Sequence, residues 1–282
     1  MKGLSVPPPP VREARVNDVS LAYLEQGQGA PVVFVHGATL DHRAWEGQRE
    51  VVSQRYRYIA LTQRYFGTGA WLDGGEKYSL ATHAADLATF IRDLTGGPTH
   101  IVGWSYGGAI VLTLAVQHPE LVKSLFVFEP GIATFVTDPV DAKAAAEDRQ
   151  EMVTAAATAS KAGDNAGAVR LFTDGVIGQP GAFDRLAPSL RSMFLDNART
   201  VPLHVGAPAP PPITCDLLGQ IKVPVAIVKG ELTRPFFRIA ADAASRCIPG
   251  SRLIVIPQGR HSAPTEESSA FNEALLGFLQ DN

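Results

Sequence analysis

The chain has 282 residues, 45% of them hydrophobic and 19% charged, which is enough apolar material for one large domain with an inserted lobe. Its net charge of −3 argues against binding to nucleic acids or anionic membranes, because both need a basic excess. We see neither a secretory signal nor an apolar run long enough to span a membrane. Two cysteines, Cys215 and Cys247, are too few for a disulfide framework, so we expect small buried side chains in a soluble, reducing, cytoplasmic setting.

The first half of the chain alternates between apolar runs and helical patterns. A turn at Asn17-Asp18 separates the first two predicted strands. Strands are predicted at 11–16, 19–27, 31–37, 56–64, 99–105 and 122–130, and helices at 41–54, 79–95 and 106–120. Strands that alternate with helices indicate crossover connections and hence a parallel sheet.

The rhythm breaks after Gly131. Residues 132–214 contain no convincing strand, are rich in alanine and helical patterns, and close with a proline-rich stretch at 207–212. Strands at 223–230 and 251–259, each followed by a helix, then resume the first pattern. We therefore predict an α/β core formed by residues 1–130 and 216–282, with an inserted helical cap at 131–215.

One motif carries chemistry: Ser105 lies between Gly103 and Gly107, where a predicted strand runs into a predicted helix. Glycines permit a turn that is too tight for Cβ atoms, and the turn exposes the serine hydroxyl at the carboxyl edge of the sheet. The backbone N–H of Tyr106 begins the helix and can face a developing oxyanion. The alternative is a glycine-rich junction that serves packing alone.

Three motifs together resemble the α/β-hydrolase fold family, over residues 11–279: His36-Gly37 after the third strand, GWSYGG at the turn, and QGRHS around His261 after the last strand. The resemblance implies a mostly parallel eight-stranded sheet flanked by helices. It also implies that His261 acts as general base and acid for Ser105, and that the N–H groups of Ala38 and Tyr106 form the oxyanion hole.

The carboxylate that would orient the histidine is less evident. Many relatives carry an aspartate after the seventh strand, but the matching position here is Thr233, and nearby Glu231 is in a different register. Some relatives place the acid after the sixth strand, where this chain has Glu129. The strands that end near Ser105 and Glu129 should be neighbours, because one helical crossover joins them. We favour Glu129 and keep Glu231 as the alternative.

Four further residues are predicted to line a substrate pocket: His36, Phe66, Trp104 and Phe135, although apolar aromatics are more often simply core. Of the other histidines, His100 and His118 are expected to be solvated, and His42, His83 and His204 to be without partners. Arg64 is predicted to pin its loop rather than to bind substrate.

Serine at position 105 favours acyl transfer, since relatives that open epoxides or displace halide use aspartate there. We predict hydrolysis of a carboxylic ester or lactone that is small, neutral and apolar. Three alternatives remain. The first is hydrolysis of a carbon–carbon bond in a diketone, the second is lyase or oxygenase chemistry with His261 as base, and the third is a non-catalytic binding protein. No metal or cofactor is expected, and a homodimer is left open.

Overall fold

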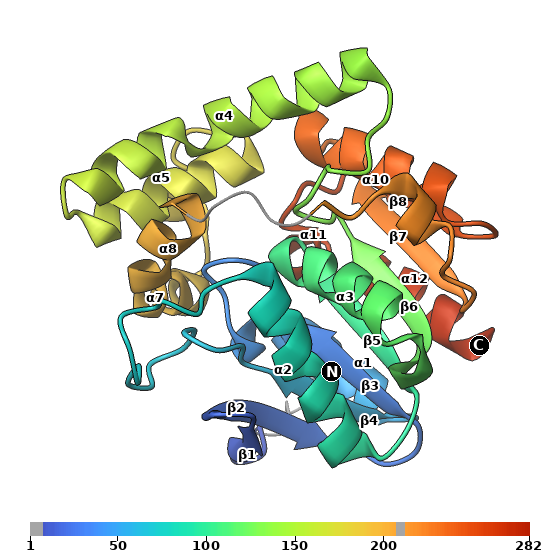
Figure 1. Ribbon diagram of the computed structural model, residues 1–282. Coiled ribbons are helices and arrows are strands. Elements are labelled where there is room, and N and C mark those ends of the chain that lie inside the picture. The colour runs from blue at the N-terminus through green and yellow to red at the C-terminus, as the bar shows by residue number, and fades with distance from the viewer. Residues whose placement is uncertain (1–7, 207–211) are drawn as a thin grey trace, which may run out of the picture.

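Eight strands form one sheet in the spatial order β1-β2-β4-β3-β5-β6-β7-β8 (Figure 1). The computed structural model describes residues 8–206 and 212–282. β2 is antiparallel to β1 and β4, and the remaining neighbours are parallel, so the predicted mostly parallel sheet is confirmed. The strands are β1 (Arg12–Val16), β2 (Val19–Gln26), β3 (Pro31–Val35), β4 (Arg57–Leu61), β5 (Thr99–Trp104), β6 (Val122–Phe128), β7 (Val225–Gly230) and β8 (Arg252–Ile256).

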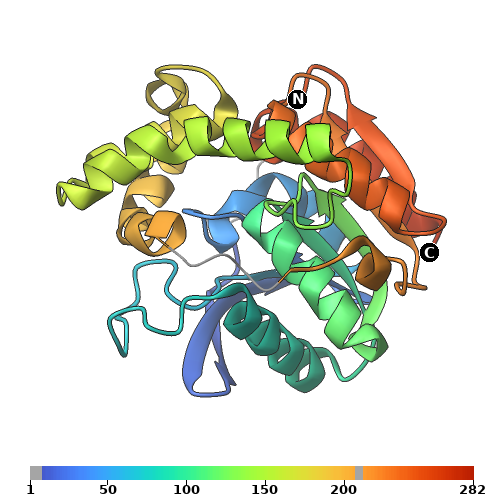
Figure 2. The same cartoon turned by 45° about the horizontal axis from the view of Figure 1, so that its top comes forward.

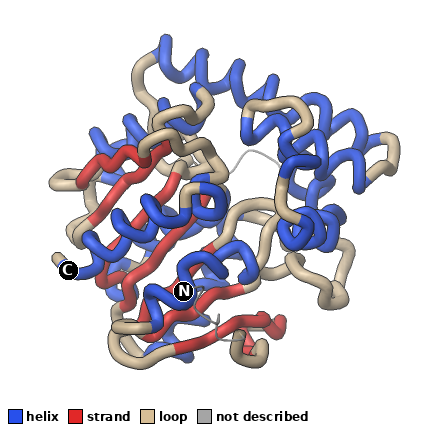
Figure 3. Tube along the Cα trace, turned by 180° about the vertical axis from the view of Figure 1, so that it is seen from behind, coloured by secondary structure: helices blue, strands red, loops and turns tan. Residues whose placement is uncertain are grey.

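Helices cover both faces of this sheet (Figures 1 and 3). Along β3, Val33 and Val35 pack towards one face, whereas Val32 and Phe34 pack towards the other. Burial on both faces explains why this strand reads as a continuous apolar run. The first face is covered by α2 (Leu80–Thr95), α3 (Tyr106–Gln117) and α10 (Pro235–Cys247), and the second by α1 (Glu46–Ser53) and α12 (Ser268–Gln280).

Between β6 and β7 the chain forms a group of helices that we call the cap. Figure 2 shows them gathered over one end of the sheet, with α4 and α5 packed along each other. The proline-rich stretch predicted to close the cap lies, except for Pro212, outside the described residues. The cap consists of α4 (Pro139–Lys161), α5 (Asn165–Ile177), α6 (Ala182–Arg185), α7 (Pro188–Asp196), the 3-10 turn η3 (Ala198–Thr200) and α8 (Val201–Gly206).

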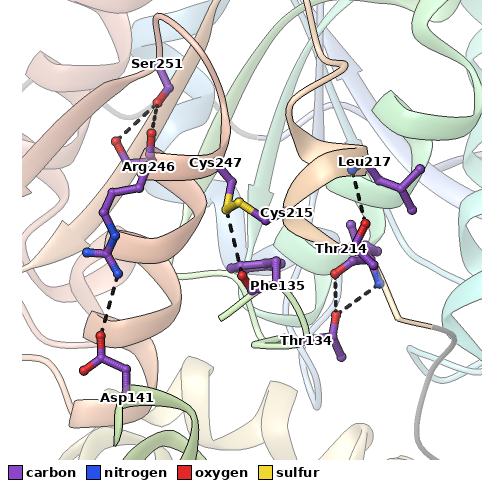
Figure 4. Close-up of a disulfide and its surroundings, with 11 residues drawn as sticks. Thr134, Phe135, Asp141, Thr214, Cys215, Leu217, Arg246, Cys247 and Ser251 are labelled. Carbon is purple, nitrogen blue, oxygen red and sulfur yellow. Dashed lines mark hydrogen bonds and ion pairs between the residues drawn. A yellow bond between two sulfur atoms is a disulfide. The ribbon is translucent and has the colours of Figure 1, made fainter. Parts of the chain in front are cut away.

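A disulfide links Cys215, at the start of α9 (Cys215–Leu218), to Cys247 at the end of α10 (Figure 4). The expectation of two unpaired cysteines is therefore wrong, because a separation of 32 residues says nothing about proximity in space. Beside it, Thr134 Oγ1 donates to Ile213 O (2.9 Å) and accepts from Ile213 N (3.1 Å). These contacts join the segments that lead into and out of the cap. The prediction of a reducing compartment loses the support it drew from free cysteines.

We expect the double variant Cys215→Ser/Cys247→Ser to lose about 3 kcal/mol of unfolding free energy, because the disulfide restricts the unfolded chain. The change is measured by urea denaturation of both proteins without reductant. Wild-type protein in excess dithiothreitol serves as the control and should approach the midpoint of the double variant. Equal midpoints for the oxidised wild type and the double variant would contradict the prediction.

Candidate active site

Ser105 occupies the bend between β5 and α3, with φ 57° and ψ −116°. A positive φ combined with this ψ lies outside the conformations that residues with a side chain normally adopt, so the backbone is strained here. Both flanking glycines are required by close approach. A Cβ on Gly103 would lie 2.6 Å from Val111 Cγ2, and one on Gly107 would lie 2.2 Å from Val35 O. The spacing of the motif is therefore a steric requirement of the bend.

The loop after β3 lies directly against this bend. A Cβ on Gly37 would lie 3.1 Å from Ser105 Cβ, so the backbone approaches the serine closely. The next residue, Ala38, lines the same cavity as Ser105. On the other side, Tyr106 begins α3, and N–H groups in the first turn of a helix have no partner within the helix. Ala38 and Tyr106, whose N–H groups are the predicted oxyanion donors, thus both lie beside Ser105.

Glu129 is completely buried at the end of β6 and has φ 45°. Its Oε2 lies 2.5 Å from His261 Nδ1 and accepts a hydrogen bond from Thr233 Oγ1 (2.9 Å). Its Oε1 accepts from the Gly230 N–H (2.7 Å). Buried carboxylates need such partners, and here they come from the end of β7, the segment after it and the segment after β8.

The alternative acid, Glu231, lies elsewhere. It is exposed, and its Oε2 accepts from Gln258 through both the backbone N–H (2.8 Å) and Nε2 (3.0 Å). Thr233, at the position where many relatives carry the acid, donates to the Glu129 carboxylate instead. We did not predict from the sequence that Thr233 supports the Glu129 carboxylate. The only indication in the sequence was a hydrogen-bond donor at the position where a carboxylate was expected.

The His261 ring is buried and held between aromatic side chains. Phe237, from α10, stacks on it with ring centroids 3.7 Å apart and an angle of 13° between the planes. Trp104 and Phe128 lie further away, at 6.0 and 6.2 Å. The Glu129 contact at Nδ1 and the stacked Phe237 together fix the orientation of the imidazole. His261 and Ser105 line one cavity.

The space between the residues that line this cavity comes to about 540 Å³ when the crevices between side chains and the opening to solvent are included. The core contributes the polar end, with Ser105, His261 and Ser262. The cap contributes an apolar wall from α5, α7 and the segment between α6 and α7. The apolar residues of this wall are Phe172, Val176, Ile177, Leu186, Leu190 and Phe194.

Of the four predicted pocket residues, Trp104 lines the cavity, and the other three lie outside its lining. His36 lies beneath the loop, where its Nε2 accepts from the Gln63 N–H (3.1 Å). Phe66 packs edge-on against His36, with centroids 4.9 Å apart, and Phe135 is buried in the core beside the disulfide. The three residues were misplaced for one reason. The sequence gives the position of a side chain along the chain, but it does not show the direction in which the side chain points.

The other histidines are better partnered than predicted. His42 Nδ1 contacts Thr62 Oγ1 (2.7 Å), His83 Nδ1 contacts Tyr106 Oη (2.8 Å), and His204 Nδ1 contacts Tyr78 Oη (3.0 Å). His100 is buried against Ser124 Oγ (2.7 Å) rather than solvated, whereas His118 is partly exposed.

Arg64 pins its loop, as predicted. Its Nε and Nη2 form a bidentate pair with Asp86, at 2.7 and 2.9 Å.

Within residues 8–206 and 212–282, no three His, Cys, Asp or Glu side chains gather as a metal site would require. Over the same residues, no helix combines the length and apolar character needed to cross a bilayer.

Residues 30–162, a little under half of the chain, match the family model described as the alpha/beta hydrolase fold, and the sheet with the strand order above has the α/β-hydrolase fold. It is 28% identical to a 2-(acetamidomethylene)succinate hydrolase of Mesorhizobium japonicum, over 95% of this chain and 94% of that protein. It is 27% identical to a putative non-heme chloroperoxidase of Synechocystis, over 93% and 95%. The esterase RhEst1 of Rhodococcus superposes with a TM-score of 0.75 at 20% identity, over 96% and 98%, and shows the fold alone.

Two buried imidazoles and one partly buried imidazole near the bend predict a loss of stability in acid. Burial lowers the pKa of His36 to about 4, of His83 to about 3 and of His204 to about 4. In the unfolded chain histidine has a pKa of about 6.5. Below pH 6.5 the unfolded state therefore binds protons that the folded state does not, so stability falls towards pH 4.

We expect the melting temperature to drop between pH 7 and pH 5, measured by calorimetry. His204→Gln should reduce the slope of the unfolding free energy against pH by up to about 1.4 kcal/mol per pH unit. His118→Gln, at a partly exposed position, is the control and should keep the wild-type slope. A wild-type protein equally stable at pH 7 and pH 5 would refute the expectation.

Proposed function

We propose that this α/β hydrolase cleaves a carboxylic ester or lactone through an acyl-enzyme on Ser105. The observation that carries the proposal is the buried contact between Glu129 and His261 Nδ1, together with the cavity that His261 and Ser105 both line. A carboxylate at Nδ1 holds the imidazole in the tautomer whose Nε2 can accept a proton.

In the proposed reaction, Ser105 Oγ attacks the carbonyl carbon as His261 Nε2 takes the hydroxyl proton. The backbone N–H groups of Ala38 and Tyr106 donate to the oxyanion of the tetrahedral intermediate. His261 then protonates the leaving alcohol oxygen as the ester C–O bond breaks. A water molecule activated by His261 attacks the acyl-enzyme and releases the acid.

The cap favours an uncharged, apolar acyl group. The aliphatic and aromatic side chains of its wall gain free energy by removing apolar substrate surface from water, at about 0.8 kcal/mol per methylene. A charged group would lose its hydration against the same wall. The Mesorhizobium relative is named for a succinate derivative, and we place the substrate of this chain in a different, neutral class.

The proposed roles predict a distinct result for each variant. We expect Ser105→Ala to abolish both fluorophosphonate labelling and cleavage of p-nitrophenyl butyrate. Glu129→Gln should lower kcat by roughly 10⁴, because the imidazole loses its orienting carboxylate. Glu231→Gln is the matched control and should stay within about twofold of wild type, because its exposed carboxylate bonds Gln258, whereas the buried Glu129 carboxylate contacts His261.

Each contrary result has a separate meaning. Turnover that survives in Ser105→Ala would favour base chemistry by His261. Wild-type protein inactive on esters, lactones and diketones would favour a binding protein. Cleavage of diketones alone would favour carbon–carbon hydrolysis. A severe loss in Glu231→Gln with little loss in Glu129→Gln would reverse the assignment of the acid.

The apolar wall predicts a chain-length preference. From acetate to hexanoate, kcat/KM for p-nitrophenyl esters should rise about fourfold per methylene until the cavity is full. Leu190→Trp should shorten the preferred chain, because Leu190 lines the cavity on α7. Leu195→Trp, on an exposed position of the same helix, should leave the profile unchanged. A flat profile, or equal effects of the two tryptophans, would exclude this wall as the acyl site.

A further inference from the structure

Asn197 lies just after α7, where the cap meets two loops of the core. Its side chain is completely buried. The Nδ2 group donates to Asp41 Oδ2 (2.8 Å) and to Met193 O (2.8 Å), and Oδ1 accepts from the Gly67 N–H (2.6 Å). A single amide thus joins the cap to the loop after β3 and to the loop after β4. Only a side chain that both donates and accepts can make this set of contacts.

The loop after β3, residues 36–41, carries the proposed oxyanion donor Ala38. Thr39 has φ 60°, which costs free energy for a residue with a side chain, so the loop must be held by its surroundings. At its first end, Gln63 Nε2 donates to His36 O (2.6 Å). At its other end the holding group is Asp41, three residues beyond Ala38.

The Asp41 carboxylate is buried and depends on its donors. It accepts from the backbone N–H of Arg43 (3.1 Å) and from the Arg43 guanidinium (2.7 and 2.9 Å), besides Asn197. Burial alone would raise the pKa of Asp41, but the Arg43 and Asn197 contacts outweigh it, so the pKa is lowered. An ionised carboxylate that loses a buried donor is destabilised, and a shift of the side chain towards another donor would recover part of that free energy. Such a movement would carry the short loop with it.

From these contacts we infer that Asn197 is a positioning residue: the cap-borne amide fixes Asp41 and thereby holds the Ala38 N–H in place, so the oxyanion hole is complete only when the cap is seated. The inference rests on the proposed function, in which Ala38 donates to the oxyanion. It assigns to the cap a role in transition-state stabilisation, in addition to its role as the wall of the cavity.

The sharpest variant is Asn197→Asp, which has nearly the same shape and still accepts from Gly67, but sets a second carboxylate against Asp41. We expect kcat for p-nitrophenyl butyrate to fall at least about tenfold with KM within about threefold, because oxyanion donors act mainly in the transition state. Asp196→Asn is the matched control. It removes the neighbouring ion pair with Arg43 (2.8 Å) but leaves the amide, so kcat should stay within about twofold.

Two further measurements separate positioning from general destabilisation. In the double variant Asn197→Asp/Asp41→Asn the two side chains exchange roles, so that an amide at position 41 again faces a carboxylate at position 197. This variant should recover part of kcat. Hydrogen–deuterium exchange over residues 36–42 should increase in Asn197→Asp and stay unchanged in Asp196→Asn. If Asn197→Asp does not fold, Asn197→Ala replaces it in both assays with the same expected direction.

The inference is overturned if Asn197→Asp keeps wild-type kcat and exchange, if its loss lies entirely in KM, or if Asp196→Asn is equally impaired. Failure of the proposed function looks different. Wild-type protein would then cleave no ester, while exchange over residues 36–42 would still report whether Asn197 holds the loop.

Discussion

The candidate site depends on one buried charge, the carboxylate of Glu129 at the end of β6. An ion with no exposed surface is stable only when its oxygens are fully hydrogen-bonded or paired. Gly230, Thr233 and His261 supply those contacts. Because β6, β7 and β8 are neighbours in the sheet, their carboxyl ends meet at one edge. The need to satisfy one carboxylate thus brings together segments that are distant in sequence.

Backbone strain at this edge is held by the same sheet. Ser105 and Glu129 both have positive φ, and each is tied to the neighbouring segment. The Ser105 N–H donates to Phe128 O (3.0 Å), the Glu129 N–H donates to Val228 O (2.9 Å), and the Gly131 N–H donates to Ser105 O (2.8 Å). A strained conformation persists when surrounding bonds over-determine it. The hydroxyl and the carboxylate are therefore presented by one rigid hydrogen-bonded unit at the ends of β5 and β6.

Local patterns predicted what depends on local chemistry. The strand–helix rhythm defined the sheet, and the steric demands of a tight bend identified Ser105 and its glycines. The placement of Glu129 near Ser105 followed from the adjacency of β5 and β6, which a single crossover implies. Its pairing with His261 rested instead on the family resemblance and on the need of a buried carboxylate for a partner. The pairing of Cys215 with Cys247 could not be predicted in this way. It depends on where the chain returns from the cap, and no local pattern encodes that. The direction of the His36 ring depends likewise on the packing of a neighbouring loop.

The cap contacts both halves of the site. On one side Asn197 bonds to the loop that carries Ala38. On the other, Asp148 of α4 accepts from Arg234 Nη2 (2.8 Å) and from the Phe236 N–H (3.0 Å) at the first turn of α10. The next residue, Phe237, is the ring stacked on His261. Any motion that lifts the cap from the core must therefore break contacts that support the imidazole on one side and the oxyanion loop on the other. Asn197 and Asp148 therefore couple access to the cavity with the positions of the imidazole and of the loop that carries Ala38.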